Sequence, residues 1–200
     1  MLRSGELVGR RISARGWMVD PASVAERARI ATEGGRPWTE HRVRSVIEAL
    51  SSGEATDGRT RALIRATESD ALWRKLAQPV MVRRFSARHP DIVRESLVLT
   101  GESAIDVIGG RLVGQPNVVH GYLREGGLDD LIDDAGLVEH SDGAVAIHAF
   151  RSGYQSWIAG NQAPPALVAV DCARSAASRV RSIGIGALEE MRQSWLTRNT

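Results

Sequence analysis

The sequence predicts an α+β protein with two parts: a helical helix-turn-helix domain at residues 1–90 and a mixed α/β domain at residues 95–200. Two amphipathic helical patterns separated by a glycine-containing break predict the first part. Short apolar runs that alternate with helical patterns predict the second. The 200 residues are enough for two small domains, and 42% hydrophobic with 25% charged residues is typical of globular proteins rather than disordered chains.

The first helix of the pair is predicted to begin near Pro21. Val24, Ala28 and Ala31 recur at the i, i+4 and i+7 spacing of a single apolar stripe. Residues 33–37 follow, and their two glycines and one proline predict a break between the helices.

The second helix is predicted to begin after Thr39, which is a good N-cap residue, and to end at residues 51–53. Its apolar positions recur at helical spacing and are Val43, Val46, Ile47 and Leu50. A short helix, a turn with glycine and a second amphipathic helix form a helix-turn-helix pattern, which is typical of proteins that bind double-stranded DNA.

The polar face of the second helix carries side chains suited to DNA contact. In a helix-turn-helix the first residues of the second helix meet base edges in the major groove, where arginine pairs bidentately with guanine. Serine and threonine hydroxyls contact phosphates instead. The same pattern also fits a plain helical hairpin with a solvated charged face. The residues predicted to contact DNA are Arg36, Thr39, His41, Arg42, Arg44 and Ser45.

The charge distribution favours the DNA interpretation. The whole chain has a formal net charge of only +2, yet residues 1–95 hold 18 basic and 12 acidic side chains, a balance of +6. Residues 96–200 hold 8 basic and 12 acidic side chains, a balance of −4. A basic first part suggests an anionic partner, although chance variation between two surfaces would give the same numbers.

The segment after the second helix is ambiguous. Residues 54–64 contain an Asp-Gly turn signal typical of the β-hairpin wing of a winged helix-turn-helix, but they also fit a helix that continues to about Leu76. Ser69 is a candidate helix cap within this segment. Residues 79–85 predict a strand or a connector into the second part.

The second part mixes strands and helices in an order that its apolar runs and turn signals define. The expected elements are a strand at Leu97–Leu99, a turn at 100–103 leading into a helix, a strand at 117–123, a helix at 128–135, a hairpin of 137–140 with 143–150, a strand at 166–171 and a helix from about 178 to 196. The helix at 128–135 carries four aspartates that diverge around its axis, which favours a solvated face over a cation site.

The predicted order of a strand, a Gly-Glu-Ser turn, a helix and a second strand resembles the first part of the nucleotidyltransferase fold. In enzymes of that fold, an Asp-x-Asp pair on the strand after the turn and a carboxylate on a later strand hold Mg²⁺. Asp171 matches the late carboxylate, but residues 118–123 contain no acid. The resemblance therefore implies a nucleotidyltransferase-like scaffold without its metal pair, and we expect no metal, no cofactor and no catalytic residue.

Residues 99–106 and 169–188 carry a likeness to the AbiEi-type antitoxins of type IV toxin–antitoxin systems and related bacterial regulators. Those proteins have this scaffold behind an N-terminal winged helix. The resemblance covers about residues 95–198. It implies an autoregulating repressor that binds its own promoter, here expected as a homodimer on double-stranded DNA, with a second domain that binds a toxin protein.

Two other functions are compatible with the sequence. The first is a nucleotidyl or phosphoryl transferase that uses Ser103, Asp106 and Asp171 with an acid from residues 129–134. The second is an interaction module that binds no nucleic acid. For a zinc site, His120, His140 and His148 lack the cysteine or paired carboxylate that would complete the ligand set.

The expected location is the bacterial cytoplasm. No stretch reaches the roughly 20 apolar residues of a membrane span, and no apolar signal region follows Met1. Cys172 is the single cysteine, so no internal disulfide can form and a reducing compartment is expected.

Overall fold

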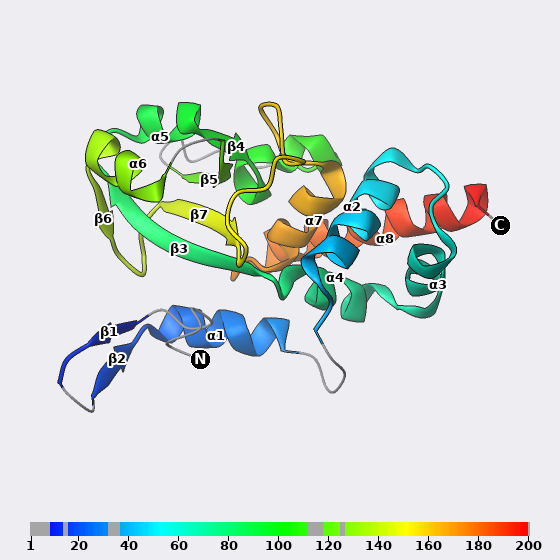
Figure 1. Ribbon diagram of the computed structural model, residues 1–200, viewed down its shortest axis with the longest axis horizontal. Coiled ribbons are helices and arrows are strands. Elements are labelled where there is room, and N and C mark those ends of the chain that lie inside the picture. Colours follow the sequence, from blue (N-terminus) through cyan, green and yellow to red (C-terminus); the bar gives the residue numbers. More distant parts are fainter. Residues whose placement is uncertain (1–8, 14–15, 32–36, 112–117, 125–126, 200) are drawn as a thin grey trace.

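The computed structural model describes residues 9–13, 16–31, 37–111, 118–124 and 127–199. Within these ranges it is an α+β protein, as predicted, with helices on both faces of one mixed sheet (Figure 1). The elements in chain order are β1 (Gly9–Arg11), β2 (Trp17–Val19), α1 (Pro21–Ile30), α2 (Glu40–Ser52), α3 (Gly58–Ala66), α4 (Ser69–Ala77), β3 (Val80–Ala87), α5 (Pro90–Ser96), β4 (Leu97–Leu99), the 3₁₀ helix η1 (Gly101–Ile108), β5 (Val119–Leu123), α6 (Leu128–Ala135), β6 (Leu137–Glu139), β7 (Val145–Phe150), α7 (Pro165–Ala173) and α8 (Ser178–Arg198).

The main sheet has the strand order β4-β5-β7-β3-β6. β5 and β7 run parallel to each other, and every other neighbouring pair is antiparallel. β1 and β2 form a separate hairpin beside α1, which the sequence did not predict (Figure 1).

The two faces of the sheet bury different sets of side chains, because successive residues of a strand point to opposite faces. On one face Phe85, Val119 and Ile147 pack with apolar residues of α5 and α6. On the other face Tyr122 and Phe150 join a larger core that includes residues of α2, α4, α7 and α8. The candidate functional groups described below lie on this second face.

The predicted strand at residues 166–171 is wrong, because this apolar run forms the helix α7. Pro165 stands at the start of the helix, where its missing N–H costs nothing. Every residue from Ala166 to Ala173 is buried, so no polar face gives the run a helical period in the sequence. A short apolar run with no such period does not distinguish a buried helix from a buried strand.

The predicted hairpin of residues 137–150 is also wrong in its pairing. Both segments are strands, but β3 lies between β6 and β7 and is hydrogen-bonded to each. The chain must therefore cross β3 on its way from β6 to β7. Gly143 makes the crossing, and a Cβ atom there would lie 2.3 Å from the backbone carbonyl carbon and oxygen of Phe85.

The region predicted as either a wing or a helix is helical. Asp57 caps α3, and its carboxylate accepts hydrogen bonds from the backbone N–H groups of Arg59 (2.9 Å) and Thr60 (3.0 Å). The helix ends at Ala66 and α4 begins at Ser69, so the two are separate helices. No residue from 54 to 66 lies in a strand, and no wing is formed there.

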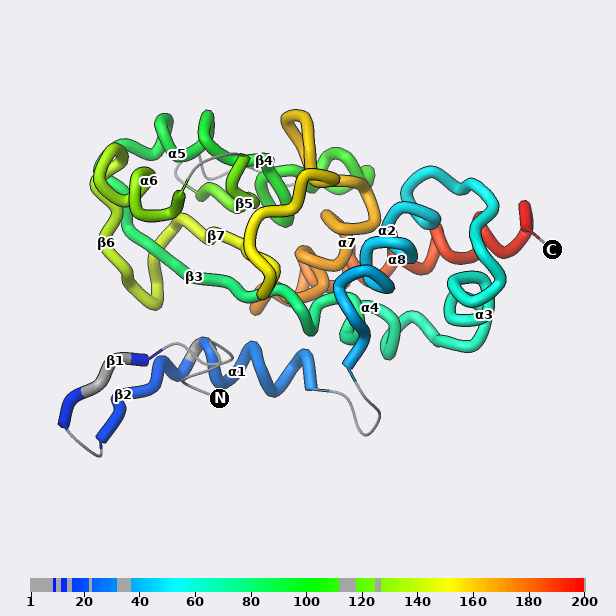
Figure 2. Tube along the Cα trace, in the orientation of Figure 1, coloured from blue at the N-terminus to red at the C-terminus, as the bar shows by residue number. Residues whose placement is uncertain are grey.

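The two helices of the predicted helix-turn-helix share only part of their surroundings. Both contact α4, but α1 lies beneath the sheet, whereas α2 also packs on α3, α7 and α8 (Figure 2). The expected apolar stripe of α1 is not buried, since Val24 is 45% exposed and Ala28 and Ala31 are exposed too. Among the α1 side chains that the structure describes, the buried apolar one is Ile30.

The sequence predicted a domain boundary between residues 90 and 95, but the hydrophobic core includes residues from both sides of it. β3 comes before that division and pairs with strands that come after it. Likewise, α2 and α4 share one core with α7 and α8. The division into two folding units stays a prediction.

α8 is the longest of the described helices and spans 21 residues. It closes the large core with Val180, Leu188 and Trp195, whose indole N–H donates to the carbonyl oxygen of Glu54 at 2.7 Å. No helix in the described ranges has the length and apolar character needed to cross a membrane.

The crossing at Gly143 can be tested by substitution. Gly143→Ala is expected to destabilise the protein by about 1–3 kcal/mol, because the added methyl group would overlap the backbone of β3. Urea denaturation measures the change. The control is Gly186→Ala in α8, where a Cβ would meet no atom within 4 Å and alanine is expected to stabilise the helix by up to about 1 kcal/mol. Equal stability of the two variants would contradict the crossing geometry.

Candidate functional site

α2 forms where the sequence predicted it and is capped at both ends. The Thr39 hydroxyl accepts a hydrogen bond from the Arg42 backbone N–H at 3.4 Å, and Gly53 ends the helix in the left-handed conformation. The buried side of α2 consists of Val43, Val46, Ile47, Ala49 and Leu50. α2 is therefore held as a rigid element with one face against the core.

The residues predicted to contact DNA are spread along the outer side of α2. His41 and Arg44 are exposed, while Arg42 and Ser45 are half-buried. The Ser45 hydroxyl donates to the carbonyl oxygen of His41 at 3.0 Å. Thr39 acts as the helix cap. Arg36 lies outside the described residues.

Both acidic side chains on this side of α2 are engaged with neighbours. Glu40 accepts hydrogen bonds from the backbone N–H of Ser152 at 3.0 Å and from its hydroxyl. Glu48 lies 2.8 Å from Nε of Arg44, whose guanidinium also lies 6.0 Å from the ring of Trp157. Arg42 has no side-chain partner among the residues that the structure describes.

α3 adds two arginines that the sequence analysis did not select. Arg59 is exposed and Arg61 is half-buried, and within the described ranges neither guanidinium has a hydrogen-bond or ion-pair partner. α3 packs against α2. The sequence carries these arginines as an Arg-x-Arg pattern that begins two residues after Asp57, in the segment that fitted either a wing or a helix.

A second set of polar groups surrounds Asp171, which is buried on the sheet face that α7 covers. Its carboxylate accepts hydrogen bonds from the Thr100 hydroxyl at 2.7 Å and the Tyr122 hydroxyl at 3.0 Å. Nδ1 of His148 lies 3.2 Å from Oδ1 of Asp171 in ion-pair geometry. Nη1 of Arg174 lies 3.9 Å from the same oxygen.

These contacts set the protonation states of the cluster. Burial opposes ionisation of Asp171, but His148, Arg174 and the Thr100 hydroxyl outweigh it and lower the pKa of the carboxyl below its ordinary value. Burial and the Asp171 charge together raise the pKa of Tyr122, which therefore stays a hydrogen-bond donor. Asp171 is thus a buried anion that two hydroxyl donors, from Thr100 and Tyr122, and two nitrogen-bearing side chains, His148 and Arg174, approach from different parts of the chain.

His120 lies beside this cluster on β5. Its ring centroid is 5.9 Å from that of His148. Burial, together with the charges of His148 and Arg84, lowers the pKa of His120 to about 3, so its imidazole is neutral at physiological pH. Gly101 has φ +52° and packs closely over this ring, since a Cβ there would lie 3.2 Å from Nδ1 of His120.

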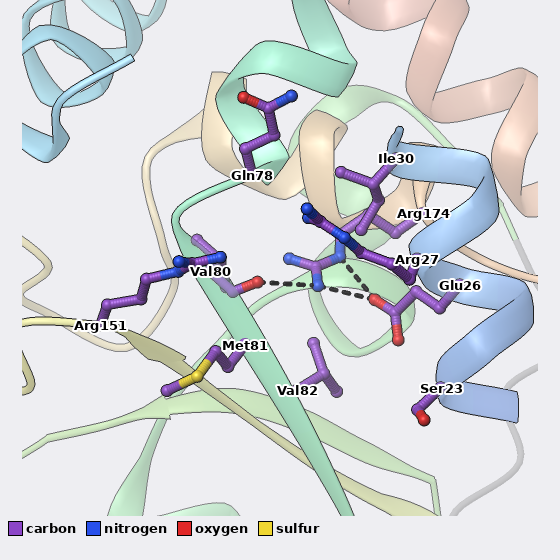
Figure 3. A pocket seen from close by; sticks show the side chains of 10 residues that line it. All are labelled: Ser23, Glu26, Arg27, Ile30, Gln78, Val80, Met81, Val82, Arg151 and Arg174. Atoms are coloured by element: carbon purple, nitrogen blue, oxygen red, sulfur yellow. Dashed lines mark hydrogen bonds and ion pairs between the residues drawn. The ribbon is translucent and has the colours of Figure 1, made fainter. Parts of the chain in front are cut away.

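α1 covers the cluster through an ion pair between Glu26 and Arg174. Their closest atoms, Oε1 and Nη2, are 2.6 Å apart, and Nη2 of Arg174 also donates to the carbonyl oxygen of Val80 at 3.1 Å (Figure 3). Burial raises the pKa of Glu26, but the Arg174 charge and hydrogen bond outweigh it and the pKa is lowered overall. Openings lined by polar residues lie on both sides of this ion pair.

The residues expected for an alternative transferase site are not brought together. The Ser103 hydroxyl accepts from the His120 backbone N–H at 2.9 Å and donates to the Val118 carbonyl, so it joins η1 to the start of β5. Asp106 is exposed, and α6 with its acids packs on the opposite face of the sheet from Asp171.

The three histidines considered for zinc are also separated. His120 and His148 are neighbours, but His140 is exposed and its Nδ1 accepts from the Asp142 backbone N–H at 3.2 Å. Across the described ranges, no three His, Cys, Asp or Glu side chains are grouped to hold a metal ion.

Comparisons with family models, with curated proteins and with solved structures found no match to this chain. The site must therefore be interpreted from its own geometry.

The Asp171 cluster predicts a pH-dependent stability. Asp171→Asn is expected to destabilise the protein by about 3–5 kcal/mol at pH 7, because it removes the charge that His148 and Arg174 face. A carboxyl whose pKa is lower in the folded than in the unfolded protein stabilises the fold at pH values above its unfolded pKa, which is about 4. This contribution is lost as the pH falls below that value. Urea denaturation between pH 7 and pH 3 should therefore show the difference from the parent protein shrinking below about pH 4.

The matched control is Asp142→Asn in an exposed turn, which should change stability by about 0.5 kcal/mol or less. A difference between Asp171→Asn and the parent that stays constant down to pH 3 would contradict an ionised Asp171.

Proposed function

We propose that this protein is a DNA-binding transcriptional regulator and that α2 is the helix that enters the major groove. Helix-turn-helix proteins place the N-terminal part of one exposed helix against base edges, and the helix must be held rigidly by the rest of the fold. α2 meets this requirement because one side is buried in the core and the other carries His41, Arg42, Arg44 and Ser45.

The proposal rests on a difference between the charged side chains of α2 and α3. The acidic side chains are bound to neighbours, whereas several arginines are not. Glu40 and Glu48 are already bound to Ser152 and Arg44. Arg42 and the α3 arginines Arg59 and Arg61 have no partners in the described part of the chain. Unpaired guanidinium groups beside a helix N-terminus are suited to phosphates and to guanine edges.

The likeness to AbiEi-type antitoxins supports a more specific form of the proposal. In that form the protein represses its own promoter as a homodimer, and the part that follows β3 binds a toxin protein in the cytoplasm. The engaged state of Asp171 and the dispersed acids fit a scaffold used for binding rather than for metal-assisted transfer.

The DNA proposal predicts a specific loss in one variant. Arg42→Ala is expected to weaken binding to duplex DNA from upstream of its own gene by about 1 kcal/mol or more. If Arg42 contacts a phosphate, the slope of log K against log salt should also fall by about 0.9. Fluorescence anisotropy across a salt series measures both quantities.

Arg88→Ala is the control, since Arg88 is an exposed arginine that lies just after β3, beside α6. It should bind DNA like the parent protein. Equal losses in Arg42→Ala and Arg88→Ala would indicate a non-specific charge effect, and unchanged binding in Arg42→Ala would remove α2 from the DNA interface.

A further inference from the structure

The second opening beside the Glu26–Arg174 ion pair is a pocket between α1 and the sheet. Arg29 enters it from α1, Arg84 from β3 and His148 from β7. Arg174, the C-cap residue of α7, also lines it. Residues from four elements therefore converge on one small polar space, and none of them belongs to the α2 surface.

Several buried nitrogen atoms in this pocket lack hydrogen-bond partners. They are Nε of Arg29, Nε2 of His148 and Nη1 of Arg174, which lies 3.9 Å from Oδ1 of Asp171. His148 and Arg174 are only 4% and 5% exposed. The Arg84 guanidinium also has no partner in the described residues. A buried donor left without an acceptor destabilises the folded protein, so a cluster of them calls for an explanation.

The acids that line the pocket are already engaged. Glu26 pairs with Arg174, and Glu102 accepts from the Ser175 hydroxyl at 2.9 Å. Asp171 accepts from Thr100 and Tyr122, and its remaining oxygen faces Nδ1 of His148. Because these carboxylates already have partners, the pocket holds more nitrogen donors than oxygen acceptors that could receive their hydrogen bonds.

We propose that this pocket binds a small oxyanion: inorganic phosphate or the phosphate group of a mononucleotide. Arg29, Arg84 and Arg174 supply guanidinium donors, which match the oxygen geometry of phosphate. His148 lines the same space, with Nδ1 facing Asp171 and Nε2 without a partner in the described residues. The site is separate from the proposed DNA-binding helix and does not depend on DNA binding.

The test is to titrate the full chain with inorganic phosphate, and separately with AMP, in a calorimeter. Titration with sodium chloride at the same ionic strength is the reference. The parent protein should bind phosphate, and Arg84→Gln should bind it about tenfold or more weakly. Arg83→Gln is the matched control, because Arg83 is the next residue of β3 but points to the other face and pairs with Glu139 at 3.0 Å. It should bind phosphate like the parent.

Tighter binding of AMP than of phosphate would assign the site to nucleotides, and equal binding would assign it to the free anion. Arg29→Gln, on α1 and outside the sheet, gives the same test if Arg84→Gln fails to fold. A parent protein that shows no binding beyond that of chloride overturns the proposal, as does equal weakening in Arg84→Gln and Arg83→Gln.

Discussion

Asp171 carries a negative charge in the interior of the protein, and ionising it there is costly unless donors surround it. Thr100 reaches it from the turn after β4, Tyr122 from β5, His148 from β7, and Arg174 from the end of its own helix. Each of these elements must therefore stand in a fixed position relative to α7. The carboxylate links the sheet, the turn and the buried helix into one arrangement.

Three further elements, α1, β3 and α2, are bonded to the two ends of α7. At its C-terminal end Arg174 holds α1 through Glu26 and holds β3 through the Val80 carbonyl. At its N-terminal end the Ala166 N–H donates to the Ser51 hydroxyl of α2 at 3.1 Å. The proposed DNA-contacting helix and the proposed anion pocket are thus fixed to one buried helix.

Periodic patterns made much of the fold predictable. α2 and α8 were predicted because their apolar residues recur at helical spacing beside polar ones. α7 was not, because burial on every side removes that period. The insertion of β3 between β6 and β7 depends on a pairing distant in sequence, which no local turn signal reveals. The Asp171 cluster was missed for the same reason, since Thr100 and Asp171 are 71 residues apart.

If α2, which is seated on α7, is the helix that contacts DNA, its amide signals should respond when DNA binds. Amide NMR spectra of the labelled protein, recorded while duplex DNA from upstream of its gene is added, test this. The largest shifts are expected on His41, Arg42 and Ser45, with smaller ones on α3 at Arg59. Shifts confined to β1 and β2, or to the sheet, with α2 unperturbed would contradict it.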